Sequence, residues 1–130
     1  MNRLSIIPAI VIIFLIFAGC SKLKEDMLEG TWELVNVADI EATHFFEWDF
    51  SNSVLTITRV LKSNPSSRVV TDTGLYRLKT SFTSTELRID NTSVQLYNND
   101  WDIIELRKDR FSMKMDIEGG ILYREFSKIP

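Results

Sequence analysis

Hydrophobic and polar positions divide the chain into two parts with different patterns. Residues 4–17 form an almost unbroken apolar run, with Ser5 as the only polar side chain. From Gly30 onward, apolar and polar residues alternate along short runs, as at Trp32 and Leu34. A period of two is typical of strands that bury one face, so the second part is expected to consist of β-strands.

The alternation predicts about seven to nine short strands, because turn-forming residues interrupt it repeatedly. The expected strands cover residues 31–35, 45–50, 55–61, 69–78, 87–89, 101–106, 111–115 and 121–127, with a less clear strand at 94–97.

Turn signals separate these strands. Residues 62–67 are expected to form a polar loop, because the residue before Pro65 is steered away from helical backbone. Gly119-Gly120 is the clearest hairpin signal in the chain. Gly74, which falls inside a predicted strand, is interpreted as a bulge or as a tight bend at a barrel corner. One helical turn is expected around residues 24–28.

These elements predict an all-β fold. Consecutive hairpins favour a small up-and-down antiparallel β-barrel of about eight strands, since closing the sheet removes its exposed edges. A β-sandwich is the alternative. One domain is expected, because removing the first 19 of the 130 residues leaves 111.

The apolar run at the N-terminus ends at a cysteine. It is too short to span a bilayer as a helix and has the length of a signal-peptide core. Phe17-Ala18-Gly19-Cys20, with the only cysteine of the chain, resembles the lipobox of bacterial lipoproteins. The resemblance implies cleavage before Cys20 and lipid, including palmitate, on that residue. Two or more acyl chains anchor a protein stably.

The resemblance divides the chain into a signal peptide (1–19), a lipidated tether (20–29) and a barrel domain (30–130). It also implies a location in the cell envelope, with the outer membrane favoured. Lys24-Glu25-Asp26 resembles a short surface-export signal, and a plain solvated tether explains it equally well.

The barrel domain is similar to small lipocalin-like lipoproteins of Gram-negative bacteria. Gly30-x-Trp32 opens the first strand as in lipocalins, and the chain ends in Tyr123-x-x-Phe126-x-Lys128. The resemblance implies that Trp32 closes one end of the barrel beneath a basic residue, for which Arg124 and Lys128 are the candidates. It also implies that a small apolar ligand is bound. Candidate wall residues are Phe46, Trp48, Tyr76, Met113 and Met115, with plain core packing as the alternative.

Composition and charge narrow the function further. The signal segment contains one basic and no acidic residue, so its removal changes the net charge from −3 to −4. The sequence lacks a cluster of basic residues of the kind that indicates nucleic-acid binding. With one cysteine, no disulfide can form within the chain.

The sequence contains no convincing catalytic or metal-binding group. His44 is the only histidine. A zinc site would lack further histidine or cysteine ligands, and a catalytic triad would lack a motif that presents a nucleophile. Acidic pairs at Glu47 and Asp49, at Asp100 and Asp102, and at Asp116 and Glu118 could serve acid–base chemistry or bind calcium, but they are interpreted as solvent-facing or turn residues. We therefore expect neither an enzyme nor a cofactor. A solid barrel that docks or inhibits an envelope protein is the alternative to a ligand carrier.

Overall fold

The computed structural model describes residues 22–35 and 43–130. They form a helix over residues 22–28, a short 3-10 helix η2 (Gln95–Tyr97) and eight strands. The strands are β1 (Gly30–Val35), β2 (His44–Ser51), β3 (Val54–Leu61), β4 (Asn64–Thr80), β5 (Thr85–Asp90), β6 (Asp100–Leu106), β7 (Arg110–Ile117) and β8 (Gly120–Lys128). Cys20 and the signal segment lie outside the described residues.

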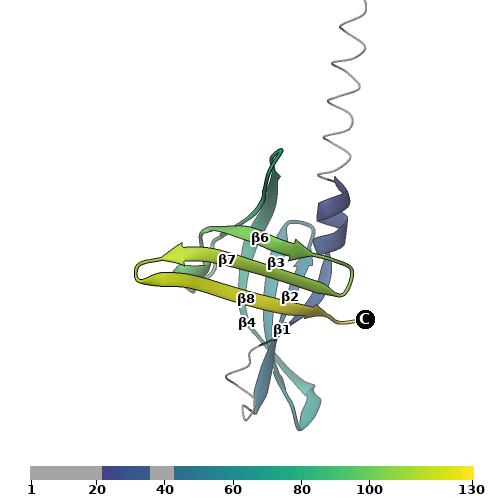
Figure 1. Cartoon of the computed structure of the whole chain (residues 1–130). Coiled ribbons are helices and arrows are strands. Elements are labelled where there is room, and N and C mark those ends of the chain that lie inside the picture. The colour runs from purple at the N-terminus through teal and green to yellow at the C-terminus, as the bar shows by residue number, and fades with distance from the viewer. Residues whose placement is uncertain (1–21, 36–42) are drawn as a thin grey trace, which may run out of the picture.

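The strands pair in sequence order, and the sheet closes on itself. Each strand is antiparallel to the next, and β1 pairs with β8 through Trp32 opposite Lys128 and Leu34 opposite Phe126. In Figure 1, β6, β7 and β8 cross in front of β1 to β4. The fold is therefore the predicted all-β, up-and-down antiparallel barrel of eight strands, and the sandwich alternative is wrong.

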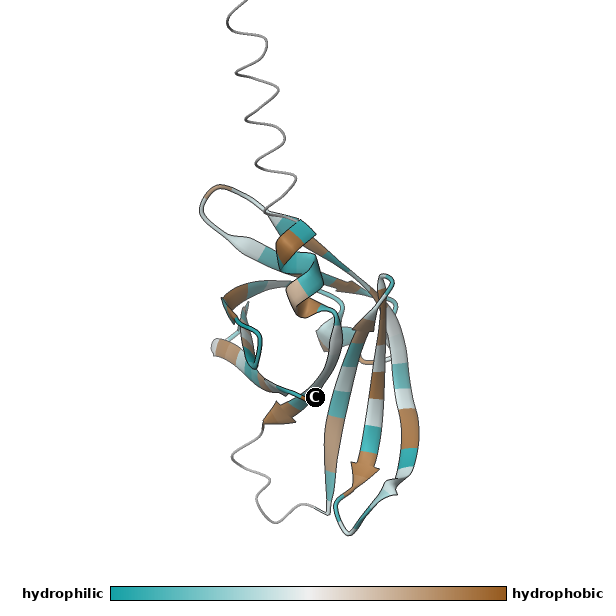
Figure 2. Ribbon diagram, turned by 90° about the vertical axis from the view of Figure 1, so that its right-hand side faces the viewer, coloured by the Kyte–Doolittle hydropathy of each residue, from teal (hydrophilic) through white to brown (hydrophobic). Residues whose placement is uncertain are grey.

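Alternating side chains build the interior. In β5, for example, Thr85, Leu87 and Ile89 are buried while the residues between them are partly exposed. Brown apolar and teal polar segments alternate along several strands in Figure 2. All three tryptophans, Trp32, Trp48 and Trp101, are at most 1% exposed. The core is continuous and strongly aromatic.

Two predictions about the bounds of strands and loops are wrong. Residues 95–97 form η2 and not part of a strand. The loop expected at 62–67 is only a two-residue turn, because β4 begins at Asn64. The strand tolerates Pro65 since the pairing register shifts there, with Leu61 opposite Asn64 and Val60 opposite Arg68.

Two glycines in the later part of the sheet have structural reasons. A Cβ on Gly74 would lie 2.6 Å from Thr92 Cγ2, so this glycine lets the segment after β5 approach β4. No register shift occurs at Gly74, so of the two interpretations of this glycine, a bulge or a tight bend, the bulge is wrong. The predicted hairpin at Gly119-Gly120 is confirmed, and Gly119 has a φ of +87° in its turn.

The helix over residues 22–28 packs against the barrel. Leu28 is fully buried in the core, and the Lys24 ammonium donates a 2.6 Å hydrogen bond to Thr85 Oγ1. Within the described residues, no helix is long and apolar enough to cross a membrane. All eight strands and the core cluster of the described residues lie between residues 22 and 130, where they share one closed sheet and one interior.

Candidate functional site

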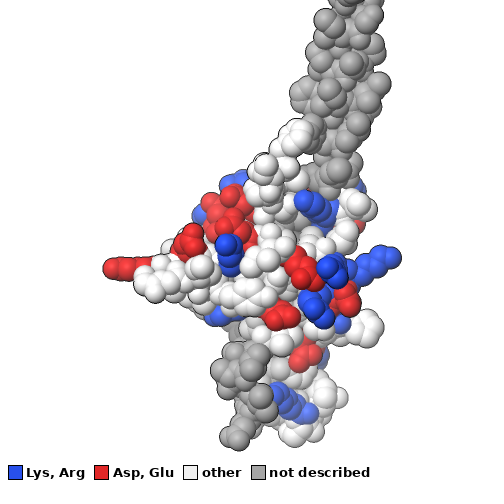
Figure 3. Space-filling model, viewed as in Figure 1, with Lys and Arg blue, Asp and Glu red and all other residues white. Residues whose placement is uncertain are grey.

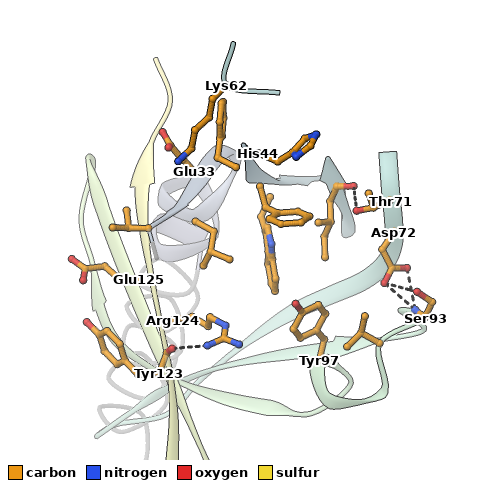
Figure 4. A pocket seen from close by; sticks show the side chains of 17 residues that line it. Glu33, His44, Lys62, Thr71, Asp72, Ser93, Tyr97, Tyr123, Arg124 and Glu125 are labelled. Carbon is orange, nitrogen blue, oxygen red and sulfur yellow. Dashed lines mark hydrogen bonds between the residues drawn. The ribbon is translucent and has the colours of Figure 1, made fainter. Parts of the chain in front are cut away.

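One end of the barrel is hollow. A cavity of about 1050 Å³, here called the end cavity, is bounded by β1, β2, β3, β4, β8 and the segment around η2. Its apolar wall consists of Leu34, Val35, Phe45, Phe46, Trp48, Ile57, Val94 and Tyr97. Its polar rim consists of Glu33, His44, Lys62, Thr71, Asp72, Ser93, Tyr123, Arg124 and Glu125 (Figure 4).

The end cavity exists because β1 and β2 separate. Their pairing runs from Gly30 opposite Phe50 only as far as Glu33 opposite Glu47. Beyond that point β1 continues with β8 alone, and the start of β2 pairs with β3 alone. The strands thus diverge at one end of the barrel and leave side chains such as Phe46 bordering a space.

Aromatic side chains form the floor of the end cavity. The Trp48 ring lies 5.1 Å from the Tyr97 ring in an edge-on arrangement and 5.2 Å from Phe126, measured between centroids. Phe126 in turn stacks on Phe111 at 4.6 Å. Trp48 therefore lies at the boundary between the packed core and the cavity, where a bound molecule would touch it.

Hydrogen bonds hold the wall segment after β5 in place. The Thr92 amide and hydroxyl both donate to Asn98 Oδ1, and the Asn98 amide group donates back to the Thr92 carbonyl. The Ser93 amide and hydroxyl donate to the Asp72 carboxylate on β4. This segment brings Val94 and Tyr97 to the cavity.

These contacts also favour the ionised form of Asp72. Partial burial alone would raise the pKa of Asp72, but hydrogen bonds from Ser93, Thr73 and Val94 outweigh it, and the pKa is lowered. The ionised carboxylate accepts the hydrogen bonds from Ser93. The charge on Asp72 therefore helps to hold the wall segment against β4.

The opposite end of the barrel is closed. The Lys128 ammonium lies 4.4 Å from the centroid of the Trp32 ring and donates to the Glu29 carbonyl. The Trp32 indole donates a 2.8 Å hydrogen bond to the Leu28 carbonyl. Burial lowers the pKa of Lys128, opposed by the carboxylates of Asp49 and Glu29.

The structure thus separates the two basic candidates for barrel closure. Lys128 covers Trp32, whereas Arg124, the other candidate, borders the end cavity. Both residues lie on β8, four positions apart, and sequence alone did not show which one is level with Trp32. Gly30 explains part of the motif, because its φ of +118° lies in the region that favours glycine.

The predicted wall residues divide into two groups. Phe46 and Trp48 border the end cavity. Tyr76, Met113 and Met115 instead belong to the packed core, where Tyr76 meets Phe50 edge-on at 5.0 Å. The sequence predicts that these side chains lie on the inner face. It does not predict which of them lie at the hollow end of the barrel and which at the packed end.

Sequence reasoning missed other wall residues. Leu34 and Ile57 were recognised only as apolar strand positions, and Tyr97 was placed in a strand that does not form. Alternation with Trp32 and Leu55 identifies the inner face for Leu34 and Ile57. No signal in the sequence marks where β1 and β2 part.

Three of the six residues in the acidic pairs have structural partners. Glu47 is buried and forms an ion pair with Arg68, and Asp49 accepts a 2.8 Å hydrogen bond from the Thr31 hydroxyl. Asp100 lies within ion-pair distance of Lys79 and of Arg88. The interpretation of Glu47 as solvent-facing is therefore wrong, because its ion pair allows it to be buried.

Residues suited to metal binding do not cluster in the part of the chain that the structure describes. His44 lies at the rim of the end cavity, with its Nδ1 atom 2.8 Å from the Thr43 hydroxyl. On the face shown in Figure 3, acidic and basic side chains lie side by side and do not form a patch of one sign.

Comparisons with protein-family models, with curated proteins and with solved structures found no match to this chain.

Proposed function

We propose that the chain is a membrane-anchored, lipocalin-like lipoprotein that binds a small apolar molecule in the end cavity. The observation that carries this proposal is the unequal filling of the barrel, which is packed around Trp32 and hollow above Trp48. Ligand pockets in proteins commonly measure about 300–1,000 Å³ and have mainly apolar walls. The end cavity fits that description in size and lining.

The same observation favours a carrier over the alternative functions. A solid barrel acting through its outer surface needs no hollow end. The polar groups at the rim are held in contacts such as Asp72 with Ser93, which suit a structural role. We propose a binding protein without catalytic activity.

The proposed anchor gives the barrel an orientation. The helix over residues 22–28 begins two residues after Cys20, a span of at most about 7 Å along the chain. The helix packs beside Trp32 at the closed end. Lipid on Cys20 would hold the closed end near the outer membrane of the envelope and leave the end cavity facing away. Palmitate labelling that is lost in Cys20→Ser tests the anchor, and labelling that persists would contradict it.

A fluorescent probe tests the binding site. The uncharged dye N-phenylnaphthylamine, which brightens in apolar surroundings, would be titrated into residues 21–130. We expect saturable binding that is greatly weakened in Leu34→Trp, because the larger side chain fills the end cavity. Ile104→Trp is the matched control, since Ile104 is 52% exposed and does not border the cavity.

A second variant guards against misfolding of Leu34→Trp. Phe46 is 38% exposed, so Phe46→Asp is expected to fold and to weaken dye binding by placing a charge beside the ligand. Circular dichroism would confirm the fold of each variant. Equal dye binding by the wild type, Leu34→Trp and Phe46→Asp would refute the proposed site.

A further inference from the structure

Among the residues that border the end cavity is a cationic side chain on the inner face of β8, Arg124. We propose that the ligand is an amphiphile with an anionic headgroup, and that the headgroup binds the Arg124 guanidinium while the apolar tail lies along the wall. This inference rests on the proposed function and specifies the chemical class of the ligand.

Strand alternation places Arg124 on the inner face of β8. Phe126, two positions further along, is fully buried in the core. Met113, directly opposite Arg124 on β7, is also fully buried. Figure 4 shows the guanidinium directed toward Tyr97, while Tyr123 and Glu125 on either side point the other way. Arg124 is half-buried in this position.

Among the described residues, the guanidinium has few partners. An arginine carries five N–H donors. Arg124 donates a 3.0 Å hydrogen bond to the Tyr123 carbonyl. Within residues 22–35 and 43–130, no carboxylate lies within ion-pair distance of it, in contrast to Arg68 and Arg88. Inward-facing charges in proteins are normally paired, so this site is suited to an anion from outside.

The acidic residues of the rim do not supply the missing partner. Asp72 is occupied by the Ser93 amide and hydroxyl. Glu125 is on the outward side of β8. Glu33 and Lys62 carry opposite charges at the rim. Arg124 is therefore the cation best placed to meet a headgroup inside the cavity.

The remaining walls suit an apolar tail. Leu34, Phe46 and Ile57 border the same space as Arg124, above the Trp48 floor. A fully apolar ligand would strip water from the guanidinium without replacing its hydrogen bonds, which is unfavourable. Carboxylate and phosphate groups both accept paired N–H bonds from arginine and remove that penalty.

Competition against the uncharged dye tests this inference. Dodecanoate, dodecyl phosphate, dodecanol and dodecyltrimethylammonium would displace the dye from residues 21–130 at pH 8. We expect at least one of the two anions to bind about tenfold more tightly than dodecanol, and the cation to bind most weakly. The stronger of the two anions distinguishes a carboxylate source from a phosphate source.

Substitutions assign the effect to one side chain. Arg124→Gln should remove the preference for the anion while dye binding persists. Arg77→Gln, on the exposed outer side of β4, is the matched control and should keep the preference. If Arg124→Gln does not fold, Arg124→Lys should reduce the preference by losing the paired geometry.

The outcomes separate this inference from the proposed function. Dye binding with no preference for anions over dodecanol would overturn the role of Arg124 and leave the apolar site standing. An anion preference that persists in folded Arg124→Gln would also overturn it. Failure of the wild type to bind any of these compounds would overturn both.

Discussion

Single hydrogen-bonded side chains fix the geometry of the end cavity. Asp72 joins β4 to the segment that carries Val94 and Tyr97, and its carboxylate accepts hydrogen bonds from Ser93. The same segment is also held by the Thr92 and Asn98 side chains and by the Trp101 indole, which donates to the Tyr97 carbonyl. The charge on the Asp72 carboxylate therefore affects both the stability of the protein and the shape of the end cavity.

Asp72→Asn is expected to lower the free energy of unfolding by about 1 kcal/mol or less at pH 7, because the contact is largely exposed. The folded state lowers the pKa of Asp72, so the contribution is present above the unfolded-state pKa of about 3.9 and is lost as the pH falls through the lowered folded pKa. Urea unfolding from pH 7 down to acid should show the two proteins converging.

Asp116→Asn is the control for this prediction, since Asp116 is an exposed carboxylate on β7. It should leave the free energy of unfolding nearly unchanged at every pH. A wild type and an Asp72→Asn variant that differ equally at neutral and acid pH would contradict the account of Asp72.

The helix over residues 22–28 is an integral part of the closed end. Leu28 supplies both a fully buried side chain and the carbonyl that accepts the Trp32 indole N–H. Lys128 covers the same tryptophan from β8. The region expected to be a tether is thus mostly structured, and only a short stretch separates Cys20 from the folded unit.

Leu28→Ala is expected to destabilise the barrel by about 2–4 kcal/mol, because it leaves a cavity at a fully buried position. Leu23→Ala makes the same chemical change on the same helix at a residue that is 61% exposed, and should cost less than about 0.5 kcal/mol. Chemical unfolding of residues 21–130 measures both. Equal stability of the two variants would show that the helix does not belong to the core.

Strand identity could be predicted from sequence because alternation reports directly on burial. The inner face was therefore correct for Phe46, Trp48 and Met113. The position of a side chain along the barrel axis could not be predicted from sequence. It depends on the pairing register and on where neighbouring strands stop pairing. Arg124 and Lys128 both lie on β8 near the predicted motif, yet their positions along the barrel put one at the end cavity and the other over Trp32.

At the scale of the whole molecule, the barrel has two unlike ends. The closed end carries the helix, Trp32 and Lys128, and the other end opens between β1 and β2. The proposed lipid at Cys20 would attach beside the closed end. In that proposed arrangement, the end cavity would face away from the lipid.

The central claim is that a small apolar molecule occupies the end cavity, and methyl NMR of residues 21–130 with the uncharged dye tests it most directly. We predict saturable shifts of the Leu34, Ile57 and Val94 methyl signals, which border the cavity. Signals of Leu87 and Ile89 in the packed core should move little. Shifts confined to exposed methyl groups such as those of Ile104 and Ile121, or no shifts at all, would contradict the account.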